Sequence, residues 1–237
     1  MPRVMLIHAV SEAIAPVREA FSERWPQCEI HNLLDSSLSA DLAAVGGVLG
    51  EGMVQRFKLL ARYAAAPAEG ERRADGILFT CSAFGPAIEA ARREVAIPVL
   101  KPNEAAFEEA LAHGPRIGLI VTFEPSLAPM LAELHAMMRA ASTQAASTQA
   151  GMGQAGGDGI RGVVVPGAFA ALRAGRQEEH DRRIAECVGS LPPLDAIVLG
   201  QFSMASAAPP ARQATSTPVL TTPGSAVDRL RHLLEHR

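Results

Sequence analysis

The chain has 237 residues, of which 48% are hydrophobic and 20% charged, and its formal net charge is −3. A chain of this length can bury one large hydrophobic core or two cores of about 100 residues each. The slightly acidic charge balance provides no basic surface for a phosphate backbone, so we expect no nucleic-acid partner. The apolar runs end well before the roughly 20 residues of a membrane-spanning helix, so we expect no membrane partner.

The amino-terminal sequence and the cysteines indicate a cytoplasmic protein. Arg3 leads directly into the strand-like run 4–8, with no signal-peptide pattern. The three cysteines, Cys28, Cys81 and Cys187, are widely spaced, which suits a reducing compartment without a disulfide framework. We interpret Cys28 and Cys187 as small buried hydrophobic residues.

Strand-like and helix-like segments alternate from the start of the chain. Residues 3–7 form an apolar run, and Ile14, Val17 and Phe21 follow at helical spacing before Pro26 ends the pattern. The sequence then predicts a strand over 29–33, one long helix up to residue 64, strands over 76–80 and 98–100, and helices over 84–95 and through Phe107 and Leu111.

The alternation continues beyond residue 115, with one interruption. The sequence predicts strands over 116–122, 162–165, 196–199 and 218–220, with helices over 127–138, 176–188, 204–212 and 227–234. The interruption, 141–159, contains Ala-Ser-Thr-Gln-Ala twice and predicts a helix extension that runs into a flexible surface insert without chemistry. Strands joined by helical crossovers predict parallel sheets that are covered on both faces.

An internal repeat with a constant offset of 120 residues indicates two similar halves. Asp75-Gly76-Ile77-Leu78 aligns with Asp195-Ala196-Ile197-Val198, Cys81 with Gln201, and Pro98-Val99-Leu100 with Pro218-Val219-Leu220. We therefore expect an α/β protein of two similar doubly wound parallel-sheet halves, related by a pseudo-twofold axis. We expect residues 1–102 with 217–237 to form the half that carries Cys81, and residues 103–216 the half that carries Gln201. Ligands of such sheets bind at the carboxyl ends of the strands, which places the predicted site in the cleft between the halves.

Cys81 follows a predicted strand and opens a helix, in the turn Thr80-Cys81-Ser82-Ala83-Phe84-Gly85. Unpaired backbone N–H groups converge at such a turn and can hold a carboxylate. The same field would lower the pKa of a thiol and favour the reactive thiolate. We therefore expect Cys81 to be the base or nucleophile, and the only cysteine that is alkylated quickly.

The turn at Cys81 resembles a known half-site. Residues 77–85, followed by Pro98-Val99-Leu100, are similar to the first half of the aspartate/glutamate and hydantoin racemase superfamily, which also contains maleate isomerase and arylmalonate decarboxylase. The resemblance covers nearly the whole chain. It implies a cofactor-independent enzyme in which one cysteine from each half acts on opposite faces of a carbon beside a carboxylate.

Carried over by position, the resemblance assigns the site residues. It makes Cys81 the first catalytic cysteine and Thr122 the residue that binds the substrate carboxylate. It further implies substrate contacts from Thr80, Ser82, Ala83, Phe123, Phe202 and Ser203. The second cysteine is replaced by Gln201, whose amide cannot take or give a proton. Arylmalonate decarboxylase also keeps one cysteine, but in the other half.

Other candidates have structural interpretations of equal or greater weight. His8, at the end of the first strand, could serve as a second base or be a hydrogen-bonded structural histidine. Glu124 could reach the cleft but fits a solvated first turn better, and Asp35 fits an Asx turn. No dinucleotide, phosphate-loop or metal-ligand motif is present, so we expect no cofactor and no metal.

Three functions therefore remain open for the sequence. The first is an isomerase or racemase of a small carboxylic acid that uses Cys81. The second is a lyase in which Cys81 protonates one face of an enediolate after carbon dioxide leaves. The third is a carboxylate-binding protein without turnover. Homo-oligomerisation stays open as well.

Overall fold

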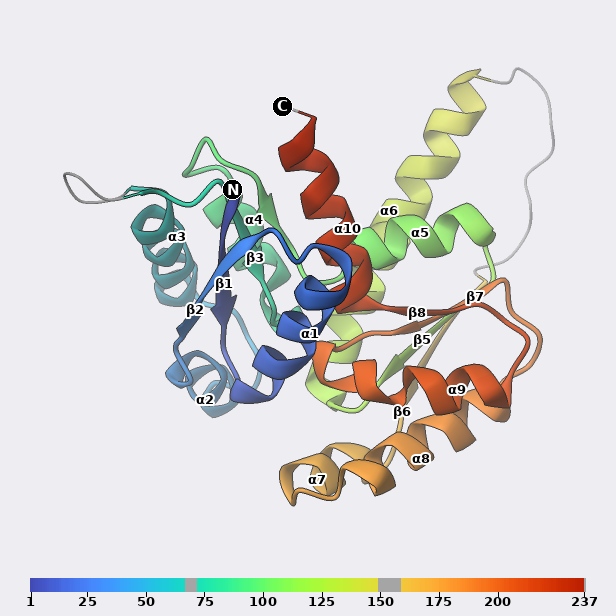
Figure 1. Cartoon of the computed structure of the whole chain (residues 1–237). Helices are drawn as coiled ribbons and strands as arrows, with labels where there is room; N and C mark the ends of the chain where they lie inside the picture. Colours follow the sequence, from blue (N-terminus) through green and yellow to red (C-terminus); the bar gives the residue numbers. More distant parts are fainter. Residues whose placement is uncertain (67–71, 149–158, 237) are drawn as a thin grey trace.

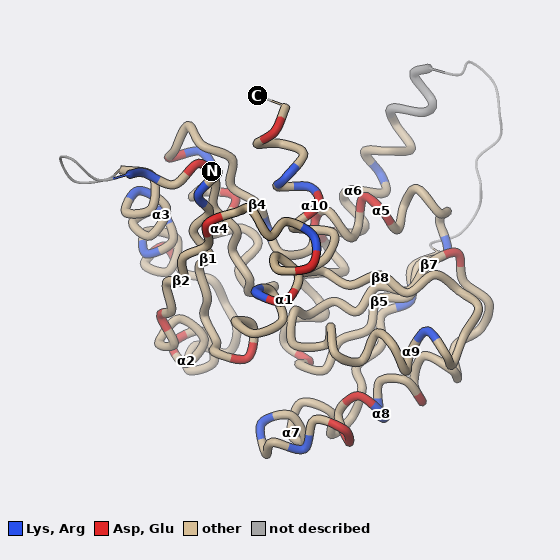
Figure 2. The backbone as a smooth tube through the Cα atoms, viewed as in Figure 1, with Lys and Arg blue, Asp and Glu red and all other residues tan. Residues whose placement is uncertain are grey.

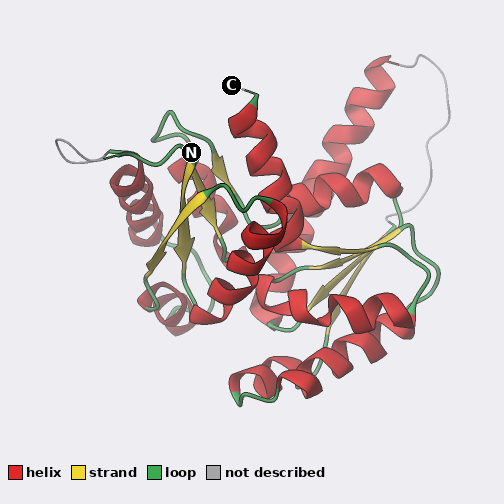
Figure 3. Ribbon diagram, viewed as in Figure 1, coloured by secondary structure: helices red, strands yellow, loops and turns green. Residues whose placement is uncertain are grey.

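The computed structural model describes residues 1–66, 72–148 and 159–236, and it contains two four-stranded parallel sheets. The strand orders are β2-β1-β3-β4 and β6-β5-β7-β8, so the two sheets have the same topology (Figure 1). Helices cover the sheets, which lie side by side in the molecule (Figure 3). The α/β fold of two similar halves predicted from the repeat is confirmed.

The first sheet is formed by residues 3–100. Its strands are β1 (Arg3–His8), β2 (Glu29–Leu34), β3 (Gly76–Phe79) and β4 (Val99–Leu100). One face is covered by α2 (Ser37–Ala44), α3 (Glu51–Ala65) and α4 (Gly85–Arg92), and the other by α1 (Ile14–Arg24) and α10 (Thr222–Glu235). Because both faces are covered, every residue of β3 is buried, which explains its uninterrupted apolar sequence.

The second sheet repeats this arrangement. Its strands are β5 (Ile117–Val121), β6 (Ile160–Val164), β7 (Ala196–Leu199) and β8 (Val219–Thr221). Its helices are α5 (Glu104–His113), α6 (Leu127–Thr148), α7 (Ala168–Arg173), α8 (Gln177–Gly189) and α9 (Ala208–Ala214). Short 3₁₀ turns over 11–13, 82–84, 124–126 and 202–207 follow the central strands β1, β3, β5 and β7.

Equivalent hydrogen bonds in the two halves confirm the repeat at the level of single atoms. Asp75 Oδ2 accepts from the Arg3 backbone N–H at 2.8 Å, and Asp195 Oδ2 accepts from that of Arg116 at 2.9 Å. The Ile77 N–H donates to Pro98 O and the Ile197 N–H to Pro218 O, both at 2.8 Å. Arg92 Nε donates to Val99 O and Arg212 Nε to Val219 O.

The structure corrects two predicted segments. The single long helix before residue 65 is two helices, because Gly46 and Gly47 adopt left-handed φ angles of 67° and 82° that end α2. Residues 141–148 belong to α6, in agreement with the predicted helix extension, and residues 149–158 of the predicted insert lie outside the described residues. The helix α7 was not predicted, because its six residues are too few for a periodic signal.

The expected division of the chain also needs a correction. Strand β8 pairs with β7, so residues 217–221 belong to the second sheet and not to the first half. Helix α10 then crosses back and packs on α1 and β3. With that change, we propose residues 1–102 with 222–237 as one half and 103–221 as the other.

The surface of the molecule carries charges of both signs. Figure 2 shows acidic and basic residues interspersed along the outer helices, including α3, α8 and α10. Among the described residues, no helix combines the length and the apolar character needed to cross a membrane.

Phe57 provides a test of the first core. Its ring stacks on Phe79 and Phe84 at centroid distances of 5.2 and 4.9 Å, and its side chain is 1% exposed. We predict that Phe57→Ala lowers the free energy of unfolding by about 3–5 kcal/mol, because it leaves a cavity between α3 and β3. Urea denaturation measures this change. Leu59→Ala is the control: Leu59 lies on the same helix but is 61% exposed, so its loss should have little effect.

Candidate active site

The first candidate side chain, Cys81, lies where β3 gives way to a helical turn. Cys81 has extended backbone angles (φ −115°, ψ 117°) and caps the 3₁₀ turn 82–84, which continues into α4. Phe84 is fully buried against Phe57 and anchors the turn in the core. The Cys81 side chain is partly exposed, whereas Ala83 beside it is buried.

The prediction that the turn lowers the pKa of the Cys81 thiol was wrong. Burial raises the pKa of the Cys81 thiol to about 11, and the backbone N–H of Ala83 opposes this only in part. Desolvation therefore outweighs the favourable field of the helical turn. At neutral pH this shift favours the protonated thiol over the thiolate.

Gln201 lies at the equivalent turn of the second half, and its side chain is held in place. Its Oε1 accepts hydrogen bonds from the Thr122 backbone N–H at 2.7 Å, the Thr122 hydroxyl at 2.8 Å and the Phe123 backbone N–H at 3.2 Å. The resemblance assigned Thr122 to a substrate carboxylate. In this structure the donors of Thr122 and Phe123 instead bind the protein's own amide oxygen.

His8 is a buried positioning residue in this structure and not a second base facing a ligand. Its ring is fully buried, with Nδ1 2.8 Å from Thr80 Oγ1 and Nε2 2.9 Å from Asn32 Oδ1. Burial lowers the pKa of His8, and the hydrogen bond to Asn32 opposes that shift. In the neutral ring Nε2–H donates to Asn32, so Nδ1 accepts from the Thr80 hydroxyl. His8 thus fixes the residue before Cys81.

The turns of the two halves touch each other directly. Ser82 Oγ donates a buried hydrogen bond to Gly200 O at 3.2 Å, so the residue after Cys81 meets the residue before Gln201. Phe202, which is 2% exposed, packs into the apolar cluster of the first half with Leu78 and Leu100. The structure therefore brings the turns of Cys81 and Gln201 together, as predicted from the repeat.

These contacts change the roles of several predicted site residues. Ser82 and Phe202 join the two halves, and Ala83 belongs to the apolar cluster under α4, so in this structure they make structural contacts. Ser203 is half-buried beside Phe202. The ring of Phe123 packs against that of Phe169 in α7, with centroids 5.3 Å apart and an interplanar angle of 51°.

The remaining candidates agree with their structural interpretations. Glu124 is exposed in the first turn after β5. Asp35 accepts from the Ser37 backbone N–H at 3.1 Å, as an Asx turn requires, and forms an ion pair with Arg56. Sequence reasoning missed Asn32, whose only signal was a polar residue on the strand beside His8. Within the described residues, no group of three or more His, Cys, Asp or Glu side chains could hold a metal ion.

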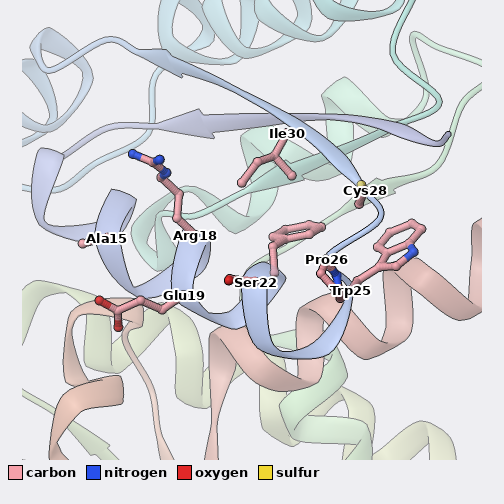
Figure 4. A pocket seen from close by; sticks show the side chains of 9 residues that line it. Ala15, Arg18, Glu19, Ser22, Trp25, Pro26, Cys28 and Ile30 are labelled. Atoms are coloured by element: carbon pink, nitrogen blue, oxygen red, sulfur yellow. The ribbon is translucent and has the colours of Figure 1, made fainter.

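A cavity of about 470 Å³ lies elsewhere on the first half. It is lined by α1 and the chain that leads into β2, as Figure 4 shows: Ala15, Arg18, Glu19, Phe21, Ser22, Trp25, Pro26, Cys28 and Ile30. None of the predicted site residues lines this cavity. Burial and the neighbouring carboxylates Asp75 and Glu29 raise the pKa of Cys28 to about 12, which disfavours its thiolate.

The fold and the strand-end turns define a class: a two-halved α/β protein with a thiol at the carboxyl end of one central strand and an amide at the other. The sequence model of the family described as Asp/Glu/Hydantoin racemase matches residues 53–230. Because this match covers most of the chain, the protein belongs to that family. No curated protein sequence matches the chain.

Solved structures share the fold over the full chain. Glutamate racemase from Bacillus anthracis superimposes with a TM-score of 0.67 at 12% identity, covering 99% of this chain and 82% of its own. Allantoin racemase from Pseudomonas fluorescens gives 0.60 at 17% identity, covering 99% and 91%. Unliganded arylmalonate decarboxylase gives 0.55 at 14% identity, covering 99% and 93%. At these identities the likeness establishes the fold.

The rate at which Cys81 is alkylated tests whether the pKa of its thiol is raised. In the variant Cys28→Ser/Cys187→Ser, Cys81 is the only thiol, and we predict that iodoacetamide labels it at pH 7.5 roughly a hundredfold more slowly than a free cysteine. The rate should rise with pH and level off only above about 11, because only the thiolate reacts. Mass spectrometry follows the labelling. A plateau below pH 9 would show that the turn stabilises the thiolate after all.

Proposed function

We propose that this protein is a cofactor-independent enzyme that transfers a proton at one face of the carbon beside the carboxylate of a small acid. Cys81 is the acid-base group. The family gives the general chemistry, and the turn geometry gives the restriction to one face. The substrate carboxylate binds near the backbone N–H groups at the start of α4, where partial positive charge is greatest.

The main support for this proposal is the set of hydrogen bonds that Thr122 and Phe123 donate to the amide oxygen of Gln201. Inversion of a stereocentre needs one group to remove a proton and another to supply one from the opposite face. Gln201 cannot titrate, and its three hydrogen bonds prevent its side chain from turning toward a substrate. His8 is buried behind Thr80. Proton transfer is therefore one-sided.

Two reactions fit a one-sided site, and they differ in the protonation state that Cys81 must start from. In an isomerase, the Cys81 thiolate removes the proton on Cα, and the thiol returns it on the same face to another carbon of the conjugated system as the double bond shifts. This reaction needs the minor, deprotonated form at neutral pH, so its rate should increase as the pH rises toward about 11.

The second candidate, a decarboxylase, is favoured by the raised pKa of Cys81. One carbon–carbon bond of a malonate-type acid breaks, carbon dioxide leaves, and its electron pair remains in an enediolate. The S–H proton of Cys81 then forms the new Cα–H bond, and the thiolate regains a proton from water. This reaction starts from the major form of the thiol, so its rate should fall as the pH rises through about 11.

A substrate panel in deuterated water tests both reactions. We predict that the wild-type protein incorporates deuterium at Cα of a small carboxylic or dicarboxylic acid with a single configuration, and that Cys81→Ala reduces this at least a hundredfold. Proton NMR measures the incorporation, and carbon dioxide release identifies the lyase. Thr143→Ala, on the exposed end of α6, is the control. Ligand binding without incorporation or gas release would identify a binding protein and overturn the proposal.

Restoring the second thiol tests the restriction to one face. We predict that Gln201→Cys raises racemisation at least tenfold over wild type, because the donors of Thr122 and Phe123 become free to stabilise a thiolate or a substrate carboxylate. Chiral chromatography of the product measures racemisation. Gln201→Ser frees the same donors without adding an acid-base group, so it should not racemise. Efficient racemisation by the wild type that survives Cys81→Ala would refute one-sided transfer.

A further inference from the structure

The side chain of Asn103 is buried without a hydrogen-bond partner. It is 1% exposed, and neither Oδ1 nor Nδ2 has a partner among the residues that the structure describes. An amide buried in this way has lost its hydrogen bonds to water and gained none from the protein. Buried polar groups are nearly always satisfied, so this exception calls for a ligand or a water molecule.

Helix capping does not explain the presence of Asn103. The residue occupies the N-cap of α5, where an asparagine oxygen usually accepts a hydrogen bond from the first turn of the helix. No such side-chain hydrogen bond is present, although the Asn103 carbonyl accepts from the Phe107 N–H at 3.0 Å as the helix begins. Both functional atoms of the amide thus remain available.

Asn103 and Cys81 follow the carboxyl ends of two paired strands. Strand β4 pairs with β3 through Ile77 with Val99 and Leu78 with Leu100. Cys81 lies two residues after the end of β3, and Asn103 lies three residues after the end of β4. The unpartnered amide and the thiol therefore belong to the same carboxyl edge of this sheet, where ligands of such sheets bind.

We propose that Asn103 is a specificity-determining residue whose amide binds a carboxamide group of the substrate next to Cys81. This rests on the proposed function of Cys81. A carboxamide supplies a donor for Oδ1 and an acceptor for Nδ2, which satisfies both orphaned atoms. A carboxylate offers acceptors only, so it would leave Oδ1 unpaired and facing negative charge. The preferred substrate therefore carries one carboxylate and one carboxamide rather than two carboxylates.

Thr222 offers a matched control in the other half. Its hydroxyl is fully buried and has no partner within the described residues, and it begins α10, which corresponds to α5 in the repeat. The neighbouring strand β7 ends at Leu199 and leads into Gln201 and not into a thiol. Thr222→Val therefore removes a similar orphaned group outside the proposed binding position.

The test compares succinamate with succinate by isothermal titration calorimetry on the full-length protein. We expect the wild type and Thr222→Val to bind succinamate at least tenfold more tightly than succinate. Asn103→Leu should lose this preference, while its Tm stays equal or rises because a buried unsatisfied amide has been removed. If Asn103→Leu fails to fold, Asn103→Ala removes the amide with a smaller side chain that cannot clash with its surroundings.

Three outcomes would overturn the proposal: no binding of succinamate by the wild type, no preference for it, or a preference that survives in Asn103→Leu. An increase in Tm with an unchanged preference would show that Asn103 holds only a buried water molecule. The deuterium experiment with Cys81→Ala tests the proposed function independently of the role of Asn103. Loss of the carboxamide preference alone refutes the role of Asn103, and proton exchange that survives Cys81→Ala refutes the function.

Discussion

The contact between the turns at Ser82 and Gly200 determines the geometry of the whole candidate site. Each turn follows the central strand of its own sheet, and one hydrogen bond with the packing of Phe202 into the opposite half fixes them together. An ion pair between Lys101 and Glu133 of α6, at 2.5 Å, adds a second link. Because Ser82 follows Cys81 and Gly200 precedes Gln201, a displacement between the halves changes the surroundings of both residues.

The two halves use one scaffold to produce opposite electrostatic conditions. In the first half, Cys81 packs against an apolar cluster that includes Ala9, and burial there raises the pKa of the thiol. The hydroxyl of Thr122 instead holds an amide oxygen. The turn of the first half thus buries a thiol, whereas the turn of the second half fixes an amide by hydrogen bonds.

Much of the fold was predictable from the sequence, because apolar runs and the 120-residue repeat depend on burial, which residue type records directly. The break before α3 was missed because glycines allow, but do not require, positive φ angles. The positions of Cys81 and Gln201 followed from the repeat. Their chemistry did not, because the pKa of a thiol and the partners of an amide depend on neighbours brought in from distant segments. Asn32 and Asn103 were overlooked for the same reason.

Helix α10 has a consequence for how the protein is made. Val227 and Leu230 pack against Val17 and Phe21 of α1, and Arg24 forms an ion pair with Asp228, so the first half is completed by residues more than 200 positions away. During synthesis, α1 leaves the ribosome long before α10 has been made, and the apolar face of α1 stays uncovered until then. Contacts so distant in sequence form slowly and leave surfaces open to aggregation. The first half is therefore completed only after the second half has been synthesised.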